Sequence, residues 1–96
     1  MITHLVLMKL KDQSPQNIKS SYSLLSSLKG KIPSLRYFEV GMDVSRSERS
    51  YDLALVSKFD DLIGLKAYLT HPEHIAVLTK LRELLASAPS VDYESS

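Results

Sequence analysis

The segment from Tyr68 to His74 concentrates the side chains of this sequence that could do chemistry. It reads Tyr-Leu-Thr-His-Pro-Glu-His, and a third histidine, His4, lies near the start of the chain. A histidine titrates near neutral pH, so it can take up a proton and return it. A tyrosine hydroxyl can polarise a carbonyl group or stabilise an enolate. Tyr68 and His74 therefore suggest acid–base chemistry on an apolar keto compound, and they are our candidate catalytic pair.

The spacing of this pair makes Pro72 important. On an unbroken helix, two residues six apart lie about 240° out of phase at 3.6 residues per turn. A proline pushes the residue before it out of the helical region, so the helix is expected to break at His71 and Pro72. The break allows Tyr68 and His74 to converge. We predict that both line one cleft with His4, between a sheet and its helices.

Other roles for the histidines remain open. His71 is expected mainly to satisfy backbone groups freed at the helix break. His4 and His74 fit a structural role as well as a functional one. A metal site on the three histidines is not favoured, because the break at Pro72 removes a shared helical face and no carboxylate completes the set. We predict no metal and no cofactor.

Alternation and periodicity predict the elements that position these residues. The first strand, over 3–11, places His4, Val6 and Met8 on one face. Ser14 and Pro15 are typical of a helix start, and Gly30 of a residue just after a helix. The remaining expectations are a helix over 15–29, strands over 35–44 and 51–59, a helical piece that Asp60 or Asp61 can cap and that ends at His71, a second piece over 72–86, and a last strand over 91–94.

This order, β-α-β-β-α-β, predicts a ferredoxin-like α+β fold. Four antiparallel strands would carry two helices on one face, in a single domain over 1–96. The other face should be polar in a monomer, yet it carries Leu5 and Leu7 on the first strand alone. We therefore predict that two sheets pack face to face as a homodimeric α/β barrel. The alternative is a monomer with a moderately apolar open face.

Composition excludes several classes of function. The chain has 96 residues, a net charge of +1 and no cysteine. Scattered charge gives no footprint for nucleic acid or a membrane surface, and no apolar run is long enough to cross a membrane. The absence of cysteine excludes disulfides and fits a reducing compartment. The first residues resemble a strand more than a signal sequence, so we expect a cytoplasmic protein.

The same residues resemble the stress-responsive α/β-barrel domain family (Dabb). The resemblance covers almost the whole chain and is most specific at the His-Pro-x-His element. The matching residues are His4, Ile32-Pro33, Gly41, Asp43-Val44, Tyr51, Phe59, the segment from Tyr68 to His74, and Asp92-Tyr93. It implies the dimeric α/β barrel and a link to stress responses.

For function, the resemblance implies a homodimer of unassigned biochemical role that binds a small apolar ligand between sheet and helices. The alternative is a cofactor-free enzyme, similar to a polyketide cyclase or to the antibiotic-biosynthesis monooxygenases. In a similar plant cyclase the positions of Tyr68 and His74 form the acid–base pair. Its aromatic pocket positions align with Ser21, Val77 and Leu85 here, so a different ligand is expected. The expected ligand-binding residues are His4, Val6, Met8, Tyr22, Leu55 and His71.

Overall fold

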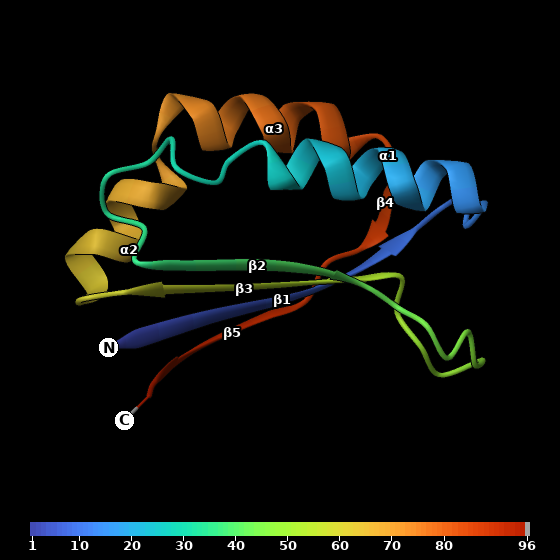
Figure 1. The fold of residues 1–96 in the computed structure, drawn as a ribbon, viewed down its shortest axis with the longest axis horizontal. Helices are drawn as coiled ribbons and strands as arrows, with labels where there is room; N and C mark the ends of the chain where they lie inside the picture. Colours follow the sequence, from blue (N-terminus) through green and yellow to red (C-terminus); the bar gives the residue numbers. More distant parts are fainter. Residues whose placement is uncertain (96) are drawn as a thin grey trace.

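Strand β1 (Ile2–Leu10) lies in the middle of the sheet, and the other strands are arranged around it (Figure 1). On one side it pairs with β3 (Leu53–Phe59), which in turn pairs with β2 (Tyr37–Met42). On the other side it pairs with β4 (Leu85–Ser87) and β5 (Ser90–Glu94). Every pairing is antiparallel. The strand order, with β1 between β3 and the β4–β5 pair and with β2 at the edge, is the order of a ferredoxin-like fold.

The computed structural model describes residues 1–95. Its helices begin where the sequence offers a capping side chain. Helix α1 (Pro15–Ser26) is capped by Ser14, whose hydroxyl accepts from the Asn17 N–H at 3.2 Å. Asp61 caps α2 (Leu62–Leu69) in the same way, through the Gly64 N–H at 2.9 Å. Within residues 1–95 no helix is long and apolar enough to cross a membrane.

The structure corrects the predicted ends of two helices and the predicted number of strands. The helix expected over 72–86 ends earlier, because α3 spans Pro72–Arg82. Leu85 instead begins β4 and pairs with Leu10 of β1. The last sheet position is thus shared by two short strands, and the described residues form five strands rather than four. The first helix is also shorter than predicted, and Gly30, at φ 79°, lies in the turns after it.

The two faces of the sheet have different surroundings. All three described helices lie on the same side (Figure 1), and alternation along β1 turns His4, Val6, Met8 and Leu10 toward them, where all four are buried. The opposite side, which we call the open face, has no helix over it. Its apolar side chains include three that are about half exposed, Tyr37, Val91 and Tyr93. The members of the open face used below are Leu5, Leu7, Tyr37, Val56, Val91 and Tyr93.

Candidate functional site

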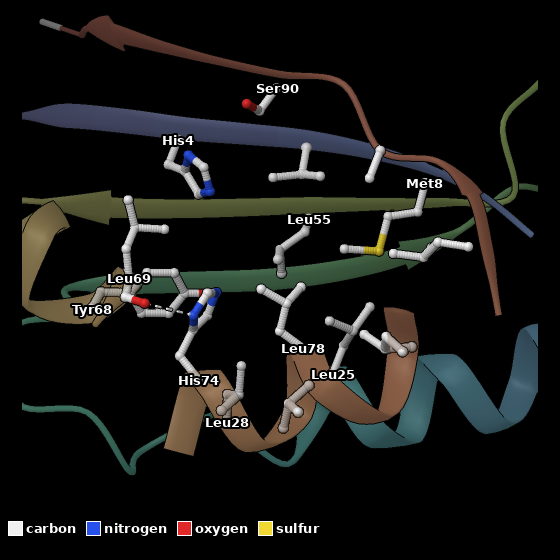
Figure 2. Close-up of a pocket in the computed structure, with 15 residues that line it drawn as sticks. His4, Met8, Leu25, Leu28, Leu55, Tyr68, Leu69, His74, Leu78 and Ser90 are labelled. Atoms are coloured by element: carbon white, nitrogen blue, oxygen red, sulfur yellow. Dashed lines mark hydrogen bonds between the residues drawn. The ribbon is translucent and has the colours of Figure 1, made fainter. Parts of the chain in front are cut away.

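A cavity of about 180 Å³ lies between α3 and the strands β1, β3 and β5. One end is polar and is formed by His4, Tyr68, His74 and Ser90 (Figure 2). The rest of the wall is apolar and comes from both layers of the fold. Its apolar residues are Val6, Met8, Leu25, Leu28, Leu55, Leu69, Val77, Leu78, Leu81, Leu85 and Ala88.

His4 reaches the cavity from β1 and is held by a carboxylate on the neighbouring strand. Its backbone lies opposite Asp92 of β5, so the two side chains share the helix-facing side of the sheet. The Nδ1 atom of His4 makes a short hydrogen bond to Asp92 Oδ1. A carboxylate can only accept, so Nδ1 carries the proton and Nε2 is left as the free ring nitrogen.

Tyr68 reaches the cavity from the end of α2. Its ring packs against Phe59, with ring centroids 5.1 Å apart, and the residue is 0% exposed. Its hydroxyl has no hydrogen-bond partner among the described residues. A buried hydroxyl without a partner is uncommon, because it has lost its water without a replacement. Burial also raises the pKa of Tyr68 to about 12, so the hydroxyl is a proton donor at neutral pH.

His74 reaches the cavity from the first turn of α3. Its ring centroid lies 4.5 Å from that of Tyr68, which is itself 6.2 Å from that of His4. The dashed line in Figure 2 joins His74 Nδ1 to the Leu69 carbonyl, at 3.1 Å. Burial lowers the pKa of His74, and the nearby His4 lowers it further, although the bond to Leu69 opposes both. A neutral His74 is favoured at pH 7.

The helix break is what brings Tyr68 and His74 together. α2 ends at Leu69 and α3 begins at Pro72, so the two side chains come from different helices. His71 lies at the break, and its Nδ1 accepts from the Glu73 N–H at 3.1 Å. His71 therefore caps the start of α3.

Two of the expected ligand-binding residues lie elsewhere. The His71 side chain caps the start of α3 and does not line the cavity. Tyr22 lies outside the cavity as well, on a groove between α1 and the edge strand β2 that it shares with Val40. The structure brings the other four, His4, Val6, Met8 and Leu55, together around one cavity with the candidate catalytic pair, Tyr68 and His74.

Sequence reasoning missed two polar residues of the site, Asp92 and Ser90. Both belong to β5, and both are placed by its pairing with β1, in which Ser90 lies opposite Val6. Alternation along 90–94 contained a signal, because it puts Ser90 and Asp92 on the side opposite Val91 and Tyr93. The register against His4 was not available from the sequence.

The site as a whole can hold a small molecule and exchange protons with it. Two imidazoles, each with Nδ1 engaged, lie near the ring of a tyrosine whose hydroxyl has no partner within the described chain. No cluster of three or more metal-ligating side chains occurs in residues 1–95. The chemistry open to these residues is hydrogen bonding to a polar group and proton transfer.

Comparisons with known proteins agree with this architecture. The family described as Stress responsive A/B Barrel Domain matches residues 2–95. An uncharacterized protein of Streptomyces coelicolor is 37% identical over 98% of this chain and 99% of its own length. A dimeric protein of unknown function from Bacteroides fragilis, with a ferredoxin-like fold, is 37% identical, with a TM-score of 0.84 over 98% of this chain and 95% of its own. A dimeric ferredoxin-like protein from Thermobifida fusca is 30% identical, with a TM-score of 0.87 over 98% and 90%.

Proposed function

This chain belongs to the stress responsive A/B barrel domain family, and from that premise we propose that it is a homodimer whose subunits each bind a small, neutral, mostly apolar molecule in the cavity beside Tyr68. The observation that carries the proposal is the Tyr68 hydroxyl, which is buried and unpartnered within residues 1–95 although Tyr68 lines a cavity. A ligand oxygen placed there would supply the missing hydrogen bond.

The lining supports a neutral ligand with one polar end. None of the cavity-lining residues described is a lysine or arginine, and Asp92 stands behind His4, so a carboxylate or phosphate would lack a counter-charge. Past the two histidines the wall is aliphatic, with Met8, Leu55 and Leu78 among its side chains (Figure 2). A ketone or alcohol with a short alkyl chain satisfies both ends. The cavity is below the range of about 300–1,000 Å³ typical of drug-sized ligands, which favours a small one.

A binding experiment tests this directly. Methyl pentyl ketone should shift the backbone amide signals of cavity residues in a ¹H–¹⁵N spectrum, and hexanoate, with a similar chain but a charge, should not. Tyr68→Phe should weaken ketone binding about tenfold, the value of one hydrogen bond to a buried group. Tyr22→Phe is the matched control, because that tyrosine lies outside the cavity. Equal binding of ketone and hexanoate, or an unaffected Tyr68→Phe, would contradict the proposal.

The open face supports the homodimer. Leu5 and Leu7 lie in register with Val56 and Ala54 of β3, and Val91 of β5 extends the same apolar surface. A second copy packed on this face removes that surface from water, and a two-fold axis makes the contact self-complementary. The two solved relatives described above are dimeric.

Sedimentation equilibrium tests the homodimer. The wild-type chain should sediment at twice its mass of 10.8 kDa. Leu7→Lys should shift it toward monomer, because a buried unpaired charge is costly. Ile63→Lys is the control, since Ile63 is an exposed apolar residue on α2 and away from the open face. A wild-type monomer at micromolar concentration would contradict the homodimer.

Catalysis of proton transfer is a second candidate function, and the bond between His4 and Asp92 favours it. With Nδ1 engaged, His4 Nε2 could remove a proton from the carbon beside a carbonyl group. The electron pair of the broken C–H bond would form the enolate double bond, and the Tyr68 hydroxyl would donate to the enolate oxygen. Enzyme-dependent incorporation of deuterium from D₂O into methyl pentyl ketone would support this, and its loss in His4→Gln would assign the base. A ketone that binds without exchange would leave binding as the function.

The family description also supports a role for this chain in a stress response. The composition of the chain, which has no cysteine, supports a cytoplasmic location. Cell fractionation tests the location, and a comparison of protein levels before and after salt or oxidative stress tests the role in a stress response. Recovery of the protein outside the cytoplasmic fraction would contradict the location. Unchanged protein levels under stress, together with unchanged stress tolerance of a deletion strain, would contradict the role in a stress response.

A further inference from the structure

The polar end of the cavity contains two histidine rings whose hydrogen-bonding roles are fixed by their partners. This end is formed by His4, Tyr68, His74 and Ser90, and the rest of the wall is apolar. A neutral imidazole has one N–H and one acceptor nitrogen, so the bond made by one nitrogen decides the role of the other. The bonds of the two rings therefore indicate which polar groups a ligand must carry at this end.

His74 offers an acceptor to a ligand. Its Nδ1 lies 3.1 Å from the Leu69 carbonyl oxygen. A carbonyl oxygen can only accept, so Nδ1 carries the proton and Nε2 has the lone pair. Burial lowers the pKa of His74, which favours this neutral form at pH 7. No group among residues 1–95 donates to Nε2, because the bond to Leu69 is the one hydrogen bond that the imidazole makes within them.

His4 has the same arrangement on the opposite layer of the fold. Its Nδ1 proton is held by the Asp92 carboxylate, so the lone pair of the neutral ring is on Nε2. Figure 2 shows the His4 ring directed into the cavity from β1 and the His74 ring from α3. The Tyr68 ring lies near both, with centroids 6.2 Å from His4 and 4.5 Å from His74. Both neutral imidazoles therefore accept hydrogen bonds, and neither donates one into the cavity.

The Tyr68 hydroxyl is the buried donor at this end. It keeps its proton at neutral pH, and it bonds to neither imidazole nor to any other group within residues 1–95. A simple ketone would accept from Tyr68, but it would shield His74 Nε2 from water without giving it a donor. Such a loss lowers affinity, because the hydrogen bond to water is not replaced. The ligand that matches this end therefore carries a donor as well as an acceptor.

From these hydrogen-bonding roles we infer that the ligand is an α-hydroxyketone, whose carbonyl oxygen accepts from the Tyr68 hydroxyl and whose own hydroxyl donates to His74 Nε2. The inference rests on the proposed binding of a small molecule in this cavity and names its chemical class. Because the rings of Tyr68 and His74 are only 4.5 Å apart, the acceptor and the donor must also be close, as they are on adjacent carbons. A carboxylate at neutral pH has acceptors alone, so it does not match the imidazole lone pairs.

Ligands that differ in one group test the class. 1-Hydroxyheptan-2-one is methyl pentyl ketone with one added hydroxyl, and 1-methoxyheptan-2-one has the same oxygen without its proton. In calorimetric titrations at pH 7, the hydroxyketone should bind about tenfold more tightly than the ketone, the effect of one hydrogen bond. The methoxyketone should bind no more tightly than the ketone. A hydroxyketone that binds no better than the ketone would overturn the inference and leave the proposed binding intact, whereas no binding of either would contradict both.

A variant of His74 tests which group receives the ligand hydroxyl. His74→Phe keeps an aromatic ring and removes the acceptor, so the tenfold preference for the hydroxyketone over the ketone should disappear. His71→Asn is the matched control, because His71 lies outside the cavity and asparagine can also cap α3. This control should keep the preference. A preference that survives in His74→Phe would overturn the inference, and the comparison of ligands in the wild type stands even if this variant fails to fold.

Discussion

His4 and Asp92 lie directly opposite each other in the β1–β5 pair, and a short hydrogen bond joins their side chains. The imidazole is 9% exposed and the carboxylate 40%, so Asp92 stands at the rim and His4 inside. The bond fixes which ring nitrogen faces the cavity.

The first prediction is that neutral His4 carries its proton on Nδ1. Long-range ¹H–¹⁵N spectra identify the protonated ring nitrogen, and in the wild type they should show the Nδ1–H form. Asp92→Asn should return His4 to a mixture of tautomers, because an amide can donate as well as accept. Asp60→Asn, which removes an exposed partner of Arg36, is the control. A wild-type spectrum dominated by Nε2–H would contradict the assignment.

The second prediction concerns the titration of His74. Its pKa should lie below the ordinary 6.5 because of burial, and His4→Asn should raise it, since His4 is one cause of the shift. The unfolded chain then binds more protons at this group than the folded chain does between the two pKa values. The free energy of unfolding should therefore fall as the pH drops below about 6.5. His74→Gln should remove this part of the pH dependence; an identical profile in wild type and variant would refute the assignment.

The third prediction is that the ligand-free protein gains or keeps stability on loss of the Tyr68 hydroxyl. Tyr68→Phe preserves the ring contacts with Phe59 and His74 and removes a buried group that has no partner in residues 1–95. An unsatisfied buried polar group costs about 1–3 kcal/mol. Thermal and urea unfolding should give an equal or higher free energy of unfolding. A loss of more than about 1 kcal/mol would mean that the hydroxyl already has a partner.

The fourth prediction concerns Asp52. Burial alone would raise its pKa, but donation from the Leu10 N–H, Arg46 and Gln13 holds the pKa below the ordinary 3.8. Its contribution to stability is then complete above about pH 4 and is lost as the pH falls through the lower, folded value. Asp52→Asn should destabilise the protein by about 1–3 kcal/mol at pH 7 and flatten the acid limb of the stability profile. Asp60→Asn should do neither, because Asp60 and its partner Arg36 are more than half exposed in the side chain.

Local pattern was enough to predict most of the fold. Strand alternation identified the buried side of β1, capping residues identified where α1 and α2 begin, and Pro72 identified where α3 begins. The end of α3 was wrong because Leu84 and Leu85 fit the helical period of the preceding turns. Their actual positions follow from distant bonds: the Lys11 N–H donates to the Leu84 carbonyl at 2.9 Å, and Leu85 pairs with Leu10. Such contacts leave no local trace in a sequence.

The candidate site was predictable to a similar extent. His4, Tyr68 and His74 meet because of strand alternation and the break at Pro72, and both are visible in the sequence. Asp92 was not assigned, because a carboxylate in an exposed alternating strand resembles any surface residue. Tyr22 shares the period of the buried Ile18 and Leu25, yet it lies at the margin of that helical face and contacts the outer groove instead.

The central place of β1 has a consequence for biosynthesis. β1 is the first strand of the described chain to leave the ribosome, but the strands beside it come from residues 53–59 and 85–94. Until then the backbone N–H and C=O groups along its edges have no strand to pair with, and 88 positions of chain separate the His4 imidazole from its carboxylate. Such distant pairings slow folding and leave an exposed strand open to aggregation. We expect the sheet to close only after residues 85–94 have been synthesised, so β1 is exposed for most of the synthesis of this domain.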